Sequence, residues 1–208
     1  MHNLPMNAPS SALEARPGLR ERKKAKTRMA IQEHALRLFR EQGYDRTTVE
    51  QIADAAEVSP STFFRYFPTK EDVVLYDALD PLIIVAFRRQ PKHLTALQAM
   101  REAMHEVWGS LSEEEMAEQL ERGRLAYDVP ALRERYVAEM VRTVSMMAGL
   151  VAERLGREPD DFKIRVATGA AIGGILGAML PLYASSEPLD AIALVDRAVE
   201  VLEGGLNL

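Results

Sequence analysis

Apolar residues recur every three or four positions along most of the chain, the spacing that gathers them on one face of an α-helix. In the first such stretch Ile31, Leu38 and Phe39 follow this spacing, and Gly43 supplies a helix stop. The pattern predicts a first helix of about 20 residues starting at Arg20. No stretch alternates apolar and polar residues with turn residues on both sides, so an all-helical fold of about nine or ten helices is expected.

Two short helices are predicted next, and each is marked by a capping residue. Thr47 to Glu50 has the pattern of a capping box, in which the Thr47 hydroxyl accepts the Glu50 amide. Ser59 is expected to cap the third helix with Pro60 at its first position, and Pro68 ends it after about two turns. Two short helices joined by a tight turn, behind a longer helix, form a helix-turn-helix that reads the major groove of DNA.

The third helix has an apolar face and a polar face. Phe63 and Phe67 lie four residues apart, so both are expected to pack into the core. The opposite face carries hydroxyl, guanidinium and phenol groups: Ser61, Thr62, Arg65 and Tyr66. Because such groups bond to base edges and phosphates, this face is predicted to contact DNA.

The charge distribution favours a DNA partner, although the net charge of −5 by itself does not. The first 70 residues hold 12 Lys and Arg against 8 Asp and Glu, whereas the remainder holds 14 against 23. A basic run extends from Arg16 to Arg28 with Glu21 as its one acidic residue. This run, including Arg28, has enough positive charge to neutralise several phosphates.

Residues 48 to 73, TVEQIADAAEVSPSTFFRYFPTKEDV, resemble the helix-turn-helix of the tetracycline-repressor (TetR) family of bacterial transcription regulators. Residues 27 to 48 resemble that family's first helix. Carried over by position, the resemblance implies DNA contacts at Thr47 or Thr48, Ser59, Ser61, Thr62, Phe64, Tyr66 and Lys70. Two further residues complete the set of candidate DNA-binding residues: Arg28 from the basic run and Arg65 from the outer face of the third helix.

The sequence departs from the family pattern at three positions, one of which is Ser61 in place of a common Gly. Phe64 stands where the family commonly has a Tyr that bonds a phosphate, so only apolar contact with DNA is expected there. Glu57 stands where a Gly often makes the turn, which predicts mild backbone strain.

The resemblance further implies that residues 75 to 208 form a helical domain that binds a small molecule and dimerises. Three apolar stripes there are rich in Met, whose flexible side chain lines adaptable cavities, although such stripes are more often plain core. The candidate ligand-binding residues are Met100, Met104, Trp108, Leu120, Tyr127, Met140, Val144, Met147 and Leu176. Polar contacts to a ligand from Arg101, His105 and Arg124 are an alternative to their lying on the solvated surface.

Residues 166 to 186 contain no charge, so a membrane-spanning helix has to be considered. The stretch is heavy in small residues, is interrupted by Pro181, and has no flanking cluster of Lys or Arg, so no membrane span is expected. Glycines at every fourth position suit close helix packing in a symmetric homodimer instead. The candidate interface residues are Gly169, Gly173, Gly177, Leu180, Ile192, Val195 and Val199.

Enzyme and metal chemistry find little support. The chain has no cysteine, which excludes thiol nucleophiles and cysteine-bound metals, and it has neither a GxSxG motif nor a phosphate-binding loop. Glu102 and His105 match half of a di-iron helix motif, but no second copy exists. We therefore expect no catalytic residue, no metal and no cofactor, and the absence of a secretory signal run favours a cytoplasmic protein.

Three parts are predicted: a disordered basic arm (1–19), a helix-turn-helix domain (20–74) and a ligand-binding and dimerisation domain (75–208). The expected function is a ligand-responsive dimeric regulator, a repressor of an inverted-repeat operator that a small, largely apolar molecule releases. Two alternatives stay open at this point. One is a small-molecule-binding helical protein in which DNA regulation is not the main activity, and the other is a membrane-tethered DNA binder.

Overall fold

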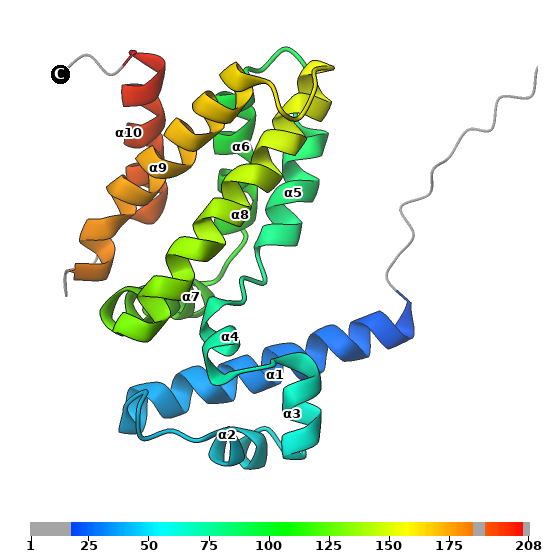
Figure 1. Cartoon of the computed structure of the whole chain (residues 1–208), viewed down its shortest axis with the longest axis vertical. Coiled ribbons are helices and arrows are strands. Elements are labelled where there is room, and N and C mark those ends of the chain that lie inside the picture. Colours follow the sequence, from blue (N-terminus) through cyan, green and yellow to red (C-terminus); the bar gives the residue numbers. More distant parts are fainter. Residues whose placement is uncertain (1–17, 185–189, 206–208) are drawn as a thin grey trace, which may run out of the picture.

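The computed structural model describes residues 18–184 and 190–205, which fold into ten α-helices without a strand (Figure 1). This confirms the predicted all-helical class. The N-terminal unit consists of α1 (Leu19–Gln42), α2 (Val49–Ala55), α3 (Pro60–Tyr66) and α4 (Lys70–Leu75). The larger unit consists of α5 (Asp80–Arg89), α6 (Ala96–Trp108), α7 (Glu113–Asp128), α8 (Pro130–Leu155), α9 (Phe162–Ala184) and α10 (Ala191–Glu203).

Helix starts follow the capping chemistry of the sequence, with one shift of register. The Ser59 hydroxyl caps α3 by accepting the Thr62 amide at 3.1 Å, as predicted. The capping box before α2 is formed by Thr48 and Gln51, not by Thr47 and Glu50 as predicted. The reason is that Thr47 is only 1% exposed, and its hydroxyl donates to the Gly43 carbonyl at 2.9 Å.

The breaks between helices fall close to the predicted Pro and Gly positions. Pro81 is the exception, because it lies in the first turn of α5, where a missing N–H does no harm. The predicted break at Ser185 to Pro188 lies outside the described residues. Glu57 has a φ of 53°, which confirms the strain expected of a non-glycine residue in the turn between α2 and α3.

The core of the N-terminal unit is built on Phe63 and Phe67, which are both fully buried and pack with Ile52 of α2. The same cluster extends into the larger unit through Ala126 of α7 and Leu132 of α8. The two units therefore share one continuous apolar contact around α4, which lies between them (Figure 1).

The larger unit is a helical bundle whose core contains residues of α5, α6, α8, α9 and α10. α9 packs against α7, α8 and α10, but it leaves much of its surface open. Its segment Phe162–Tyr183 is long and apolar enough to cross a membrane by length and composition alone, and 22% of its most apolar stretch is buried. The structure thus leaves an apolar outer face on α9 to be covered.

Candidate DNA-binding surface and ligand cavity

The recognition helix α3 presents the polar face that the sequence predicted. Ser59, Ser61 and Arg65 are exposed, Thr62 and Tyr66 are half-buried, and Phe64 is 49% exposed. The Ser59 hydroxyl lies 2.9 Å from the Ser61 hydroxyl and donates to the Thr62 hydroxyl at 3.0 Å. These contacts place three small hydroxyls together at the start of the helix, where an approaching backbone meets no bulky side chain.

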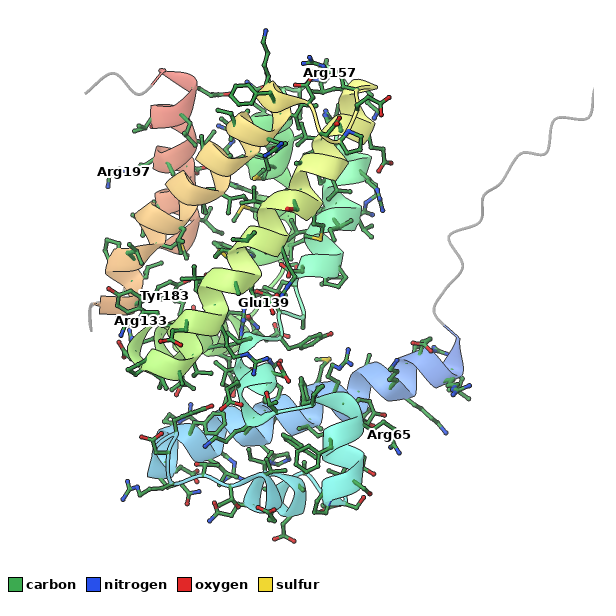
Figure 2. All side chains as sticks on the ribbon, in the orientation of Figure 1. Arg65, Arg133, Glu139, Arg157, Tyr183 and Arg197 are labelled. Atoms are coloured by element: carbon green, nitrogen blue, oxygen red, sulfur yellow. The ribbon has the colours of Figure 1, made fainter. Side chains whose placement is uncertain are left out.

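An open groove brings the basic residues of α1 next to α3. The groove is lined by Leu19, Arg20, Glu21, Lys23, Lys24, Thr27, Arg65 and Tyr66. The basic residues from Arg20 to Arg28 thus lie on a helix, whereas Arg16 lies outside the described residues. Figure 2 shows Arg65 projecting from α3 at the end of the molecule away from the bundle. A single polyanion in this groove would meet both helices.

Three predicted DNA contacts are occupied within the chain. Thr47 is buried, so the prediction is wrong for this residue, whereas Thr48 is exposed and stays the candidate. The Arg28 guanidinium lies 4.8 Å from the centroid of the Tyr76 ring and faces two further rings, so it is wedged under α3 and is not offered to phosphates. Lys70 donates two hydrogen bonds to the Tyr44 and Thr47 carbonyls, at 2.9 and 3.1 Å.

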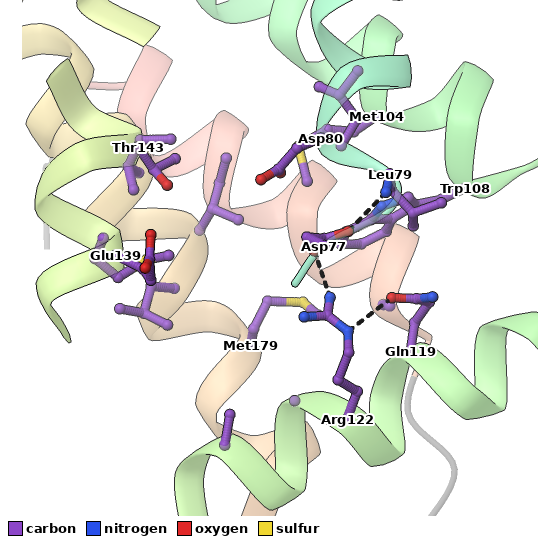
Figure 3. Close-up of a pocket in the computed structure, with 18 of the residues that line it drawn as sticks. Asp77, Leu79, Asp80, Met104, Trp108, Gln119, Arg122, Glu139, Thr143 and Met179 are labelled. Carbon is purple, nitrogen blue, oxygen red and sulfur yellow. Dashed lines mark hydrogen bonds and ion pairs between the residues drawn. The ribbon is translucent and has the colours of Figure 1, made fainter. Parts of the chain in front are cut away.

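A cavity of about 240 Å³ lies inside the larger unit (Figure 3). Seven of the nine candidate ligand-binding residues line it: Met100, Met104, Trp108, Leu120, Met140, Met147 and Leu176. Tyr127 and Val144 do not line it, so the prediction is wrong for these two. The wall also contains Ile83, Ile84, Ile172, Ile175 and Met179, so it is mainly apolar and flexible, as a binding site for an organic molecule requires.

The polar groups of the cavity come from residues that the sequence did not single out. The Arg122 guanidinium pairs with Asp77, and its Nε donates to the Gln119 amide oxygen at 3.1 Å (Figure 3). Asp80 and Glu139 also line the wall. Asp77 belongs to the connection after α4 and Asp80 is the first residue of α5, and two acidic residues at the start of an apolar helix were the signal that could have pointed to them.

Models of known protein families match both parts of the chain. The family described as "Bacterial regulatory proteins, tetR family" matches residues 31–76, and "MftR C-terminal domain" matches residues 94–207. The HTH-type transcriptional regulator TcmR of Streptomyces glaucescens is 37% identical over 86% of this chain and 83% of its own length. The chain belongs to the TetR family of transcriptional regulators.

Solved structures share the fold of this chain. The FadR repressor of Thermus thermophilus in complex with lauroyl-CoA matches with a TM-score of 0.56 and 23% identity, over 87% of this chain and 95% of that chain. The SmeT–triclosan complex matches with a TM-score of 0.57 and 20% identity, over 85% of this chain and 91% of that chain. At this identity the likeness establishes the fold and leaves the ligand of this TetR-family chain open.

The polar residues considered as ligand contacts lie elsewhere in this TetR-family chain. The His105 Nε2 lies 2.7 Å from an Asp196 carboxylate oxygen, and Arg101 pairs with Glu102 at 3.0 Å. Arg124 does not line the cavity. The described part of the chain contains no group of three or more His, Cys, Asp or Glu side chains placed to hold a metal, and this includes the surroundings of Glu102 and His105.

The candidate dimer residues fall into two groups. A Cβ added at Gly169, Gly173 or Gly177 would meet no neighbouring atom of the same subunit within 4 Å, and Leu180 is 38% exposed. Ile192 is half-buried. Val195 and Val199 are buried within the subunit, so they are core residues and the interface prediction is wrong for them. Their positions on α10 face the bundle, because one face of an amphipathic helix has to cover the core.

Proposed function

We propose that the protein is a ligand-responsive repressor that binds an inverted-repeat operator as a dimer and is released by a small, largely apolar molecule. The groove between α1 and α3 carries this proposal, because it gathers exposed cations beside the hydroxyl face of the recognition helix. Positive charge at the phosphates gives affinity, and the side chains at base edges give sequence preference. The protein would act in the cytoplasm and without catalysis.

The second half of the proposal concerns the effector. The cavity is lined mainly by apolar side chains, and the structurally similar FadR and SmeT proteins are described in complex with lauroyl-CoA and triclosan. An apolar effector that enters this cavity would remove its own apolar surface from water, and this favours binding.

A set of hydrogen bonds supports coupling between the cavity and the DNA-binding unit. Arg122 lines the cavity, pairs with Asp77 and donates to the Val74 carbonyl at the end of α4 at 3.3 Å. On the other side of α4, the Gln32 amide of α1 donates to the Val73 and Tyr76 carbonyls, both at 2.8 Å. A ligand that displaces Arg122 would favour another position of α4, and with it another spacing of the recognition helices.

Dimerisation is proposed through the outer face of α9. Gly169, Gly173 and Gly177 allow the backbone of a second helix to approach closely, and the exposed Val166 and Leu180 supply apolar area on the same helix. This arrangement also covers the surface that would otherwise suit a membrane.

A mobility-shift assay on the DNA upstream of the protein's own gene tests the proposal. The expected result is a retarded complex that an inverted repeat within the fragment competes away and an unrelated fragment does not. Absence of a complex would favour a small-molecule-binding protein without DNA regulation. Fractionation of cells tests the remaining alternative, since a membrane-tethered DNA binder would sediment with membranes.

A further inference from the structure

The charges in the cavity wall are unequal in number. Three carboxylates line it, those of Asp77, Asp80 and Glu139, against the single guanidinium of Arg122. A mainly apolar cavity with an excess of negative groups is unfavourable when empty, because carboxylates lose hydration there without gaining a cation. The missing positive charge therefore indicates which kind of ligand the cavity binds.

The three carboxylates differ in their partners. Asp77 pairs with Arg122, and Glu139 accepts hydrogen bonds from the exposed Arg142 guanidinium outside the cavity. The Asp80 carboxylate has no hydrogen bond or ion pair with any other residue of the described ranges 18–184 and 190–205. Figure 3 shows its carboxylate directed into the space between α5 and α8.

Asp80 lies on the exposed side of the cavity. Among the residues that line the cavity, Asp80 and Met146 are the exposed ones, so the cavity opens between the start of α5 and the middle of α8. Burial on its inner side, with a smaller contribution from Asp77, raises the pKa of Asp80 to about 6 against the opposing effect of Arg122. The carboxylate is thus ionised at neutral pH but poorly compensated.

An anionic ligand has no free guanidinium to meet. The Arg122 side chain already donates to Asp77, to Gln119 and to the Val74 carbonyl, and two carboxylates stand near it. A cation gains from the Asp80 carboxylate, and the aromatic side chains of Trp108, Tyr136 and Tyr183 line the same cavity.

We propose that the effector is an organic cation, an apolar body carrying a protonated amine, and that Asp80 binds its ammonium group at the mouth of the cavity. This assignment rests on the proposed function only in treating the cavity as the effector site. It narrows "largely apolar" to a molecule with one positively charged end.

Three probes with one apolar body test the charge preference: 4-phenylbutylamine, 4-phenylbutanol and 4-phenylbutanoate. Calorimetric titration of the full-length protein at pH 7.5, without DNA, is expected to show the amine binding at least about ten-fold more tightly than the alcohol, and the carboxylate binding weakest. Asp80→Asn should lower the affinity for the amine by about ten-fold and leave that for the alcohol within about two-fold. Glu134→Gln, which changes an exposed carboxylate of α8 outside the cavity, should bind all three probes like the parent.

Several outcomes overturn the assignment: equal affinity for amine and alcohol, tighter binding of the carboxylate, or no binding of any probe. An amine preference that survives in Asp80→Asn also overturns it. The ranking of the probes on the parent does not depend on the variant folding well. Because these titrations contain no DNA, they stand apart from the mobility-shift assay, whose failure would contradict the repressor and not the cation site.

Discussion

Arg65 is the cationic side chain that α3 itself offers to DNA. It is exposed, it stacks on the Tyr66 ring with its guanidinium carbon 5.4 Å from the centroid, and it borders the groove with α1. Arg65→Ala should therefore weaken operator binding by about 1–3 kcal/mol, the range of a good base contact, with no loss of helical content.

Fluorescence anisotropy on a labelled operator measures this effect. Arg157→Ala provides the matched control, because Arg157 is also an exposed arginine but lies at the opposite end of the molecule, where it pairs with Asp161 (Figure 2). Equal affinities of Arg65→Ala and the parent would show that the outer face of α3 does not read the operator.

Asp80 makes stability depend on pH. Its pKa of about 6 in the folded protein exceeds the ordinary 3.8, so the folded state holds this proton more tightly than the unfolded state. As the pH rises from 3.8 to about 6, the unfolded state loses this proton before the folded state does. The stability that the protonated Asp80 side chain contributes is therefore lost over this range.

Asp80→Asn, which does not titrate, should therefore gain stability over the parent as the pH rises from 5 to about 7.5. Urea unfolding across this range measures the difference, with Glu134→Gln as the control for an exposed carboxylate. A difference that does not change with pH would contradict the raised pKa of Asp80 in the folded protein.

At the scale of elements, α1 has two tasks along its length. Its second half carries Ile31, Ala35 and Phe39 into the core, whereas its first half extends beyond the packed unit and is exposed on nearly every side (Figure 1). Because the cations of the first half lie on a helix, their spacing is fixed relative to α3, which a disordered arm would not achieve.

The double substitution Lys23→Ala, Lys24→Ala should reduce the salt dependence of operator binding. Removing the charge opposite one phosphate lowers the slope of log affinity against log salt by about 0.9. Titrations between about 50 and 200 mM salt measure the slope, and Lys92→Ala, an exposed lysine between α5 and α6, is the control. An unchanged slope would place the phosphate-binding residues elsewhere.

At the scale of the whole molecule, the outer face of α9 decides the assembly. Gly173 has open space around it in one subunit, so Gly173→Leu should leave each subunit folded but push apart two copies that pack there. Operator affinity should then fall steeply, because an isolated subunit loses the second half-site about one DNA turn away.

Sedimentation analysis is expected to give a monomer for Gly173→Leu and a dimer for the parent. Gly149→Leu on α8, where an added side chain also starts in open space, should remain dimeric. A dimeric Gly173→Leu protein with unchanged operator affinity would remove this glycine face from the interface.

The sequence by itself determined the helical class and the helix-turn-helix, and it predicted seven residues of the cavity wall. The first two features depend on contacts between near neighbours in the chain. Ser59 caps the residues just after it, and Phe63 and Phe67 share a face because four residues make about one helical turn.

Only the tertiary structure decided which polar groups are free. Thr47 and Arg28 looked like DNA contacts, but the first is buried and the second is held between aromatic rings from α3 and the end of α4. Asp80 drew no attention in the sequence, since its environment comes from α7 and α8, far away in the chain. The exposure and charge of a side chain depend on the elements packed around it, and their arrangement is fixed by the whole fold.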